Sequence, residues 1–374
     1  MSHAFTFSDA QALVPYLARL GVGACYSSPF LMARAGSLHG YDITDHNRLN
    51  PELGTDADFA AFTQTLEAHD LLLLLDFVPN HMGIDSQSNM WWREVLENGP
   101  CSLYARFFDI DWDPVTPEMK NKVLLPILGD QYGAVLERGE LTLGIDDGHL
   151  VVRYYDQTLP INPRQQPLVL RHRIDELKAA MGLGAADLRE FLSILTGLDN
   201  LPRYTDTSSD SIEERHREKE VLRERLRRLL KAAPRIRAHV EQALAAANGV
   251  PERPETFDTL HHLLEEQPYR LAYWRTAQHE INYRRFFDIN ELAGVRVEDP
   301  LVFEATHSLL TRLLAHNQVH GLRIDHPDGL FDPAGYFARV QALARRSPAA
   351  TSDGRPRRTD AERPIWMIAE KILS

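Results

Sequence analysis

The sequence has little cysteine, no long apolar run and no excess of positive charge. Its 374 residues include only two cysteines, Cys25 and Cys101, which form no CxxC motif and fit a reducing compartment. The longest apolar run, residues 71–75, is far too short to cross a bilayer, and no charged start followed by an apolar signal core is visible. The sequence therefore predicts a cytoplasmic protein with no membrane partner.

The charge balance argues against a nucleic-acid partner. The formal net charge is -12 at pH 7, whereas a protein that binds nucleic acid or anionic lipid needs a basic surface. The one basic run, residues 215–237, is interleaved with glutamates and is typical of a solvated helix face laced with ion pairs. A neutral substrate suits this composition, and the length allows a large core or two domains.

Helices and strands are expected to alternate at both ends of the chain. The pattern predicts helices over residues 10–20, 57–69, 300–315 and 333–346, and strands over residues 22–27, 71–81, 319–325 and 365–369. The first helix has Ser8 or Asp9 as its candidate cap and ends at Gly21. Continuous apolar strands of this kind are buried on both faces. We therefore predict an α/β fold with a parallel sheet covered by helices.

The alternation stops between residues 82 and 300. Aromatic side chains crowd the start of this segment, and Asp147 and Gly148 mark a hairpin turn between two strand-like runs. A charged helical pair is expected over residues 209–248, broken at Pro234, and a polar loop over residues 346–363. The segment is therefore expected to be a large, mostly helical insertion.

The most informative stretch is residues 321–330, with the sequence GLRIDHPDGL. On a strand, side chains two residues apart share a face, so Arg323 and Asp325 are expected to point into the same space. An arginine there holds a carboxylate ionised and oriented, as a nucleophile requires. The stretch by itself fits a structural ion pair at the end of a strand equally well.

Other polar residues follow neighbouring strands, where the chemistry of α/β folds collects. These candidates are Asp76, Asn80 and His81 after one strand, His326 beside Asp325, Glu370 after the last strand, and His39, Tyr41 and Asp42 in a glycine-containing loop. Two carboxylates about 5–5.5 Å apart are the minimum for glycoside chemistry with retention, with Asp325 as nucleophile and Glu370 as proton donor. Asp76 has the alternative role of bracing its loop together with Asn80. His46 and His69 are interpreted as packing or surface residues.

A metal phosphohydrolase is a weaker interpretation. It would use Asp42, Asp45, His46, Asp325 and His326, but the sequence has neither a His-x-His pair nor a glycine-rich phosphate loop. We therefore expect no metal and no cofactor.

Three short motifs carry a family resemblance. Residues 76–81 (DFVPNH), 321–326 (GLRIDH) and 369–371 (AEK) resemble the first three signatures of the α-amylase superfamily, in order and at strand ends. Within that superfamily the chain resembles the maltooligosyltrehalose synthase family over nearly its whole length, in residues 37–46 (SLHGYDITDH), 50–54 (NPELG), 91–99 (WWREVLENG), 282–290 (NYRRFFDIN), 325–330 (DHPDGL) and 370–373 (EKIL).

The resemblance implies an isomerase of trehalose biosynthesis that converts the reducing-end α-1,4 bond of a maltooligosaccharide into an α,α-1,1 bond. Asp325 attacks the anomeric carbon, and Glu370 first protonates the leaving glucose and then acts as base. Water must be kept out, so an aromatic wall over the leaving glucose is expected from Trp91, Trp92, Tyr283 and Phe286. Any one of these residues could equally belong to the core of the insertion.

The resemblance also implies the fold, a partial (β/α)8 barrel containing strands 2 to 5 and a large insertion after strand 3. Residues 1–81 and 301–374 are then two parts of the catalytic barrel, and residues 82–300 are the insertion. The family's first strand and fourth signature have no counterpart here. We therefore expect an N-terminal portion that is inactive alone and needs a complementing C-terminal chain. The alternatives are a hydrolase or a 4-α-glucanotransferase of the same superfamily, or a non-catalytic glucan-binding fragment.

Overall fold

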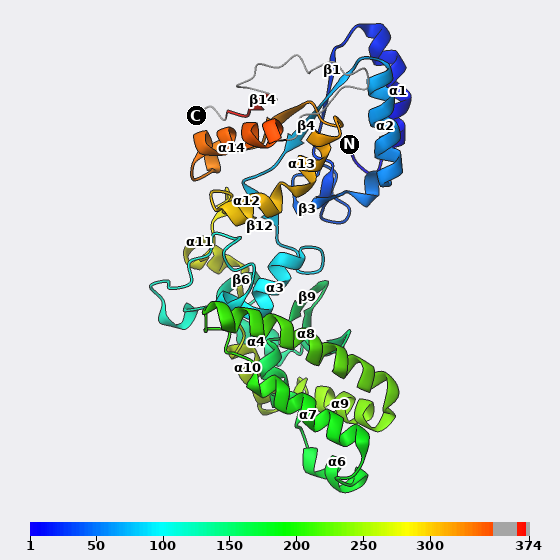
Figure 1. Cartoon of the computed structure of the whole chain (residues 1–374). Helices are drawn as coiled ribbons and strands as arrows, with labels where there is room; N and C mark the ends of the chain where they lie inside the picture. Colours follow the sequence, from blue (N-terminus) through cyan, green and yellow to red (C-terminus); the bar gives the residue numbers. More distant parts are fainter. Residues whose placement is uncertain (347–364, 372–374) are drawn as a thin grey trace. The chain divides into compact units, whose positions relative to one another are not determined.

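The chain forms two compact units in a computed structural model that describes residues 1–346 and 365–371 (Figure 1). Unit 1 comprises Met1–Asn89, Arg106–Asp109 and Arg284–Ser374, and unit 2 comprises Met90–Ala105 and Ile110–Tyr283. Most of the polar loop predicted over residues 346–363 lies outside the described residues. No helix within the described ranges is long and apolar enough to span a membrane.

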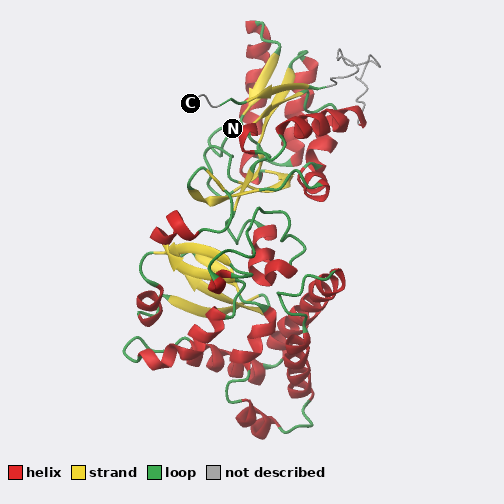
Figure 2. Cartoon of the chain, turned by 90° about the vertical axis from the view of Figure 1, so that its left-hand side faces the viewer, coloured by secondary structure: helices red, strands yellow, loops and turns green. Residues whose placement is uncertain are grey.

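Unit 1 is built on a parallel sheet of four strands, in the order β1 (Ala24–Ser27), β4 (Leu72–Phe77), β13 (Gly321–Ile324) and β14 (Trp366–Ala369) (Figure 2). All four correspond to predicted strands. Strand β4 is central, and residues 73–77 in it are buried, as its apolar run requires. In the register of the sheet Arg323 lies opposite both Asp76 and Ile368. This register brings the carboxyl ends of β4, β13 and β14, with the polar residues at or after them, to the same edge of the sheet.

The predicted helices of unit 1 are present as α1 (Phe7–Leu20), α2 (Asp56–Ala68), α12 (Pro300–Thr306), α13 (Ser308–Ala315) and α14 (Pro333–Arg346). Helices α1 and α2 lie side by side (Figure 1). The cap of α1 is Thr6, which forms a capping box with Asp9, and the prediction of Ser8 or Asp9 as the cap was wrong. The helix predicted over residues 300–315 is interrupted at His307, whose ring bonds the Phe303 carbonyl and the Tyr336 hydroxyl.

Two small antiparallel sheets complete unit 1. One pairs β2 (Leu31–Ala33) with β3 (Ile43–Leu49), and the other contains β5 (His81–Gly83), β11 (Arg285–Phe286) and β12 (Ile289–Gly294). The strand predicted over residues 71–81 stops at Phe77, and His81 begins β5 instead. Because β5 pairs with β12, residues 82–89 and 284–300 belong to unit 1, and unit 2 is narrower than the insertion expected over residues 82–300.

Unit 2 contains five strands as well as helices. Strands β6 (Val123–Leu128) and β10 (Tyr269–Tyr273) pair in parallel, and β7 (Leu141–Asp146), β8 (His149–Tyr154) and β9 (Gln157–Pro160) form an antiparallel meander that includes the predicted hairpin. The helices are α3 (Met90–Asn98), α4 (Tyr132–Glu137), α5 (Gln166–Leu170), α6 (Ile174–Met181), α7 (Ala186–Asn200), α8 (Ser209–Ala232), α9 (Pro234–Ala247), α10 (Asp258–Glu265) and α11 (Ala277–Glu280). Helices α8 and α9 are the predicted charged pair, which breaks at Pro234.

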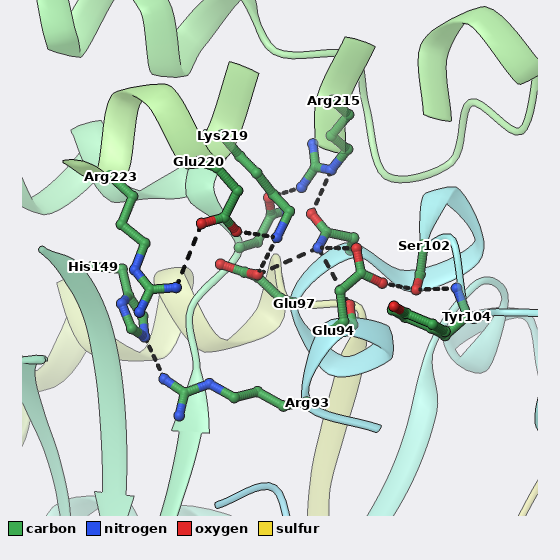
Figure 3. A network of polar contacts seen from close by, with 12 residues as sticks. Arg93, Glu94, Glu97, Ser102, Tyr104, His149, Arg215, Lys219, Glu220 and Arg223 are labelled. Carbon is green, nitrogen blue, oxygen red and sulfur yellow. Dashed lines mark hydrogen bonds and ion pairs between the residues drawn. The ribbon is translucent and has the colours of Figure 1, made fainter. Parts of the chain in front are cut away.

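Helix α8 also carries a buried ionic network (Figure 3). Lys219 donates to Glu97 at 2.9 Å, and Arg215 donates to Asn98, which in turn donates to Glu94 at 3.0 Å. Arg215 is 0% exposed and Lys219 4% exposed, so the interpretation of the basic run as a solvated face was wrong for these two residues. A buried cation needs partners, and the two glutamates of α3 supply the opposite charge.

Candidate active site

One guanidinium group joins the ends of three strands in unit 1. Arg323 of β13 donates to Asp76 Oδ1 of β4 at 2.9 Å and to Asp325 Oδ1 at 2.6 Å, and its Nη2 lies 2.9 Å from Glu370 Oε1. The backbone supports this arrangement, because the amide of Asp325 donates to the Phe77 carbonyl and the amide of Glu370 to the Ile324 carbonyl. Asp325 and Glu370 therefore contact the same guanidinium group from the ends of adjacent strands.

Burial dominates the electrostatics of Asp325. Its side chain is 7% exposed, and burial raises the pKa of its carboxyl to about 6, against the lowering effect of Arg323. Burial opposes the charge of Arg323 as well, but hydrogen bonds to Asp76 and Asp325 outweigh it and raise the pKa of the guanidinium. Arg323 favours the ionised carboxylate, as expected from the sequence, whereas burial opposes it and has the larger effect on the pKa of Asp325.

Glu370 lies in polar surroundings, although an apolar strand delivers it. Its Oε1 contacts Arg323, and its Oε2 accepts a hydrogen bond from the backbone amide of His326 at 2.8 Å. The Glu370 side chain is 29% exposed, more than that of Asp325. The two carboxylates therefore differ in surroundings, as two groups with different roles must.

Asp76 is the anchor of the cluster. Its carboxylate is fully buried, and its Oδ2 accepts hydrogen bonds from the hydroxyls of Tyr26 and Tyr41, the latter at 2.7 Å. Tyr26 did not appear among the predicted residues. A signal for it existed, because β1 pairs with β4 and Tyr26 lies opposite Leu74, two residues before Asp76. The alternative role of Asp76 paired it with Asn80, but the partners found are Tyr26, Tyr41 and Arg323.

Two histidines from the segments that follow Asp76 and Asp325 contact the ring of a phenylalanine. His81 is fully buried and its ring centre is 4.1 Å from that of Phe286, which lies 5.0 Å from the ring of His326. Burial lowers the pKa of His81 to about 3, so this imidazole is neutral. Among the described residues, His81 Nε2, His326 Nδ1 and Asp325 Oδ2 are buried without a hydrogen-bond partner. Buried polar atoms of this kind can bind the hydroxyls of a ligand.

A second arginine, Arg284, connects the loops that carry these histidines. It donates to Asn80 Oδ1 at 2.7 Å, to the Gly329 carbonyl at 3.3 Å and to the Val295 carbonyl at 3.1 Å. A Cβ on Gly329 would lie 2.7 Å from Asn80 Oδ1 and 2.5 Å from the His326 ring, so only glycine fits there. Sequence reasoning did not single out Arg284, because its motif gives no hint of the loops that it binds.

The glycine-containing loop places His39 and Asp42 around Tyr41. The amide of Tyr41 donates to His39 Nδ1 at 3.0 Å, and Asp42 accepts from the Ser37 hydroxyl. The His39 side chain is 60% exposed, whereas that of Asp42 is 16% exposed. These two residues hold the loop that delivers Tyr41 to Asp76.

The four aromatic residues expected to form a wall fall in different units. Phe286 belongs to unit 1, whereas Trp91, Trp92 and Tyr283 belong to unit 2. Trp91 stacks on Tyr104 with ring centres 5.6 Å apart, and Trp92, 1% exposed, meets Tyr283 edge-on at 5.5 Å. Trp92 and Tyr283 are core residues of unit 2, whereas Trp91 is half-buried.

The residues proposed for a metal site do not come together. His46 is fully buried, and its Nε2 bonds the Val78 carbonyl at 2.9 Å, which is a packing role. His69, which was not part of the metal interpretation, is exposed and bonds the Thr65 carbonyl, in agreement with its interpretation as a surface residue. Over residues 1–346 and 365–371, no group of three or more His, Cys, Asp or Glu side chains is suited to hold a metal ion.

Comparisons with known proteins show which sequences this chain resembles. The family model of the α-amylase catalytic domain matches residues 11–133. A putative maltooligosyl trehalose synthase of Mycobacterium tuberculosis is 30% identical over 371 residues, which are 99% of this chain and 33% of that protein. The α-amylase SusG of Bacteroides thetaiotaomicron is 33% identical over 110 residues, 29% of this chain and 15% of that protein.

Solved structures give the same result. The maltooligosyltrehalose synthase of Arthrobacter ramosus aligns with a TM-score of 0.62 and 29% identity, over 98% of this chain and 36% of that chain. The chain thus spans about a third of the length of the relatives that it matches. It has an α/β fold of the amylase type and is similar over nearly its whole length to the maltooligosyltrehalose synthases.

Proposed function

We propose that this chain carries the catalytic residues of a maltooligosyltrehalose synthase, an isomerase that converts the reducing-end α-1,4 bond of a maltooligosaccharide into an α,α-1,1 bond. The observation that carries the proposal is the pair of carboxylates, Asp325 and Glu370, on one guanidinium at the ends of adjacent parallel strands. The similarity to maltooligosyltrehalose synthases along 98% of the chain supports the substrate class.

In this mechanism Asp325 Oδ2 attacks the anomeric carbon of the penultimate glucose, and the α-1,4 bond breaks as Glu370 gives its proton to the leaving oxygen. The result is a glycosyl ester on Asp325 and a free glucose. The glucose turns over, its anomeric hydroxyl attacks the same carbon, and Glu370 takes the proton back. The ester bond to Asp325 breaks, so no water is consumed. Arg323 stabilises the Asp325 carboxylate before attack and after release.

The remaining predicted residues are proposed to bind the sugar. The neutral imidazoles of His81 and His326 offer ring nitrogens to hydroxyl groups, and Phe286 and Tyr41 offer apolar ring faces. His39, Asp42, Asp76 and Asn80 position these groups. The wall of Trp91, Trp92 and Tyr283 stays a prediction. A water-excluding wall matters because water competes with the turned glucose for the ester.

We propose further that the sheet of unit 1 is strands 2 to 5 of a (β/α)8 barrel, with the insertion of residues 82–300 after strand 3 and barrel sections at residues 1–81 and 301–374. Exposed side chains on the two outer strands support this proposal. Tyr26 of β1 is 56% exposed, and Trp366 and Ile368 of β14 are 56% and 39% exposed, whereas parallel sheets are normally covered on both faces. A complementing chain that adds the other strands would cover them. A cytoplasmic location stays a prediction from the sequence.

The test uses maltopentaose with the chain, alone and together with a polypeptide supplying the remaining barrel strands. Loss of reducing ends without release of free sugar is expected with the complementing polypeptide, and Asp325→Asn and Glu370→Gln should abolish it. Release of glucose or maltose at the rate of the reaction would favour a hydrolase, and longer glucans would favour a 4-α-glucanotransferase. Glucan binding with no turnover under any combination would leave the non-catalytic interpretation and overturn the proposal.

A further inference from the structure

Unit 2 contains a cavity that the proposed reaction does not use. Its volume is about 460 Å³, within the range typical of small-molecule sites. It lies beside the two-stranded sheet of β6 and β10, and all of its lining residues belong to unit 2. Those that matter below are Met119, Lys122, Leu124, Tyr132, Leu271 and Tyr273.

The lining of the cavity includes apolar and aromatic residues. Leu124 and Leu271 are buried leucines of the lining, and Ala272 contributes a small side chain. Tyr132 and Tyr273 line the cavity and are half-buried, so part of each side chain is accessible. Rings presented in this way can pack against a flat apolar face.

The polar groups of the cavity carry charges of both signs. Glu118, Glu265 and Glu280 are exposed carboxylates, and Lys122 and Arg270 are the cations among the lining residues. An anionic ligand such as a phosphate would meet more carboxylates than cations here. A neutral ligand with many hydroxyl groups can instead donate to the carboxylates and accept from the cations.

The lining is held in place by hydrogen bonds. Asn282 accepts from the Leu124 amide at 2.9 Å and donates to the carbonyls of Lys122 and Asp111 at 2.8 Å. The Tyr132 hydroxyl lies 3.1 Å from a ring nitrogen of His261. A lining fixed before binding lowers the entropy lost when a ligand enters.

We propose that this cavity binds glucose units of a maltooligosaccharide, as a glucan-binding site separate from the carboxylates of unit 1. A pyranose has an apolar CH face for a tyrosine ring and a rim of hydroxyls for the charged side chains. The choice of glucan as the ligand rests on the proposed function, whereas the amphipathic, preformed cavity is a property of unit 2 alone.

Two methionine methyl groups can distinguish binding at this cavity from binding at the proposed active site. Met119 lines the cavity, and Met82 follows His81 in β5. In the full chain labelled with ¹³C at its methionine methyls, titration with maltotriose is expected to shift the Met119 signal in a saturable manner. A Met82 shift without a Met119 shift overturns the cavity site and leaves the proposed function standing. The absence of both shifts overturns the cavity site and counts against the proposed function as well.

Variants test the role of the ring. Tyr273→Ala is expected to weaken the maltotriose affinity reported by Met119 at least tenfold, while the affinity reported by Met82 stays the same. Tyr273→Phe keeps the ring and should retain most of the affinity. The matched control is Tyr155→Ala, because Tyr155 is 78% exposed in the same unit and does not line the cavity. Equal affinity in Tyr273→Ala and Tyr155→Ala would refute the site even if both variants fold normally.

Discussion

Arg323 is the residue whose loss should disturb unit 1 most. It is the cation that holds the fully buried Asp76, the nearly buried Asp325 and Glu370. Arg323→Met keeps much of the side-chain volume but leaves Asp76 as a buried carboxylate whose remaining partners, among the residues that the structure describes, are two tyrosine hydroxyls. Breaking a buried ion pair by removing one partner costs about 3–5 kcal/mol. We therefore expect the free energy of opening the sheet of unit 1 to fall by that amount in Arg323→Met.

Hydrogen exchange measures this locally, which matters because a chain of two units need not unfold in one step. The amides of β4 and β13 in Arg323→Met are expected to lose protection by roughly a hundredfold to a few thousandfold, since each 1.4 kcal/mol is a factor of about ten. The amides of β7 and β8 in unit 2 provide an internal control and should not change. Arg323→Lys should lose less protection than Arg323→Met but more than the parent, because one ammonium cannot reach three carboxylates as a planar guanidinium does.

Two variants decide whether the cause is the unpaired charge. Adding Asp76→Asn to Arg323→Met removes that charge and should restore part of the protection, so the two effects are not additive. Arg138→Met is the matched control, because Arg138 also contacts two carboxylates, Asp130 and Glu140, but on the surface. It should change little. Protection of β4 in Arg323→Met within twofold of the parent, or a double variant with strictly additive losses, would refute the reasoning.

Three further predictions follow from buried groups and close contacts. Asp325 binds its proton more tightly in the folded protein than in the unfolded chain. The free energy of unfolding of unit 1 should therefore fall by roughly 3 kcal/mol as pH rises from the ordinary carboxyl range to about 6. Urea unfolding at several pH values measures this slope, and Asp325→Asn should remove it. The same argument applies to Glu94 in unit 2, whose pKa burial raises to about 7, and Glu94→Gln should flatten the pH dependence of β8 exchange up to that pH. Gly329→Ala should displace Asn80 and His326 and lower turnover of the complemented enzyme by about tenfold to a hundredfold, whereas Gly133→Ala, where a Cβ meets no atom within 4 Å, should not.

The sequence predicts the strands that carry the chemistry because they are unusual locally. An apolar run leads to Asp76 within β4 and to Glu370 just after β14, and the two-residue period alone places Arg323 of β13 and Asp325 on one face. Tyr26 was missed because its relation to Asp76 exists only across two strands, through their register. Arg284 was missed for the same reason, since its partners come from loops far away in the sequence.

The burial of charge in unit 2 was also beyond sequence reasoning. A helix with alternating arginines, lysines and glutamates has the pattern of a solvated face. The pattern cannot show that α3 brings Glu94 and Glu97 against it, which turns Arg215 and Lys219 inward (Figure 3). Local composition therefore predicts that a helix forms, whereas its orientation depends on which other element supplies the opposite charge.

The two carboxylates of the proposed active site should respond to each other. The like charge of Glu370 adds to burial in raising the pKa of Asp325, while Arg323, which both residues share, lowers it. Glu370→Gln removes the like charge and leaves the guanidinium in place, so the pKa of Asp325 should fall below about 6. A ¹³C NMR titration of the aspartate carboxyl groups measures this directly, with Glu67→Gln on α2 as a surface control. An Asp325 pKa that rises or stays constant in Glu370→Gln would show that the two carboxylates are not coupled and would refute this reasoning.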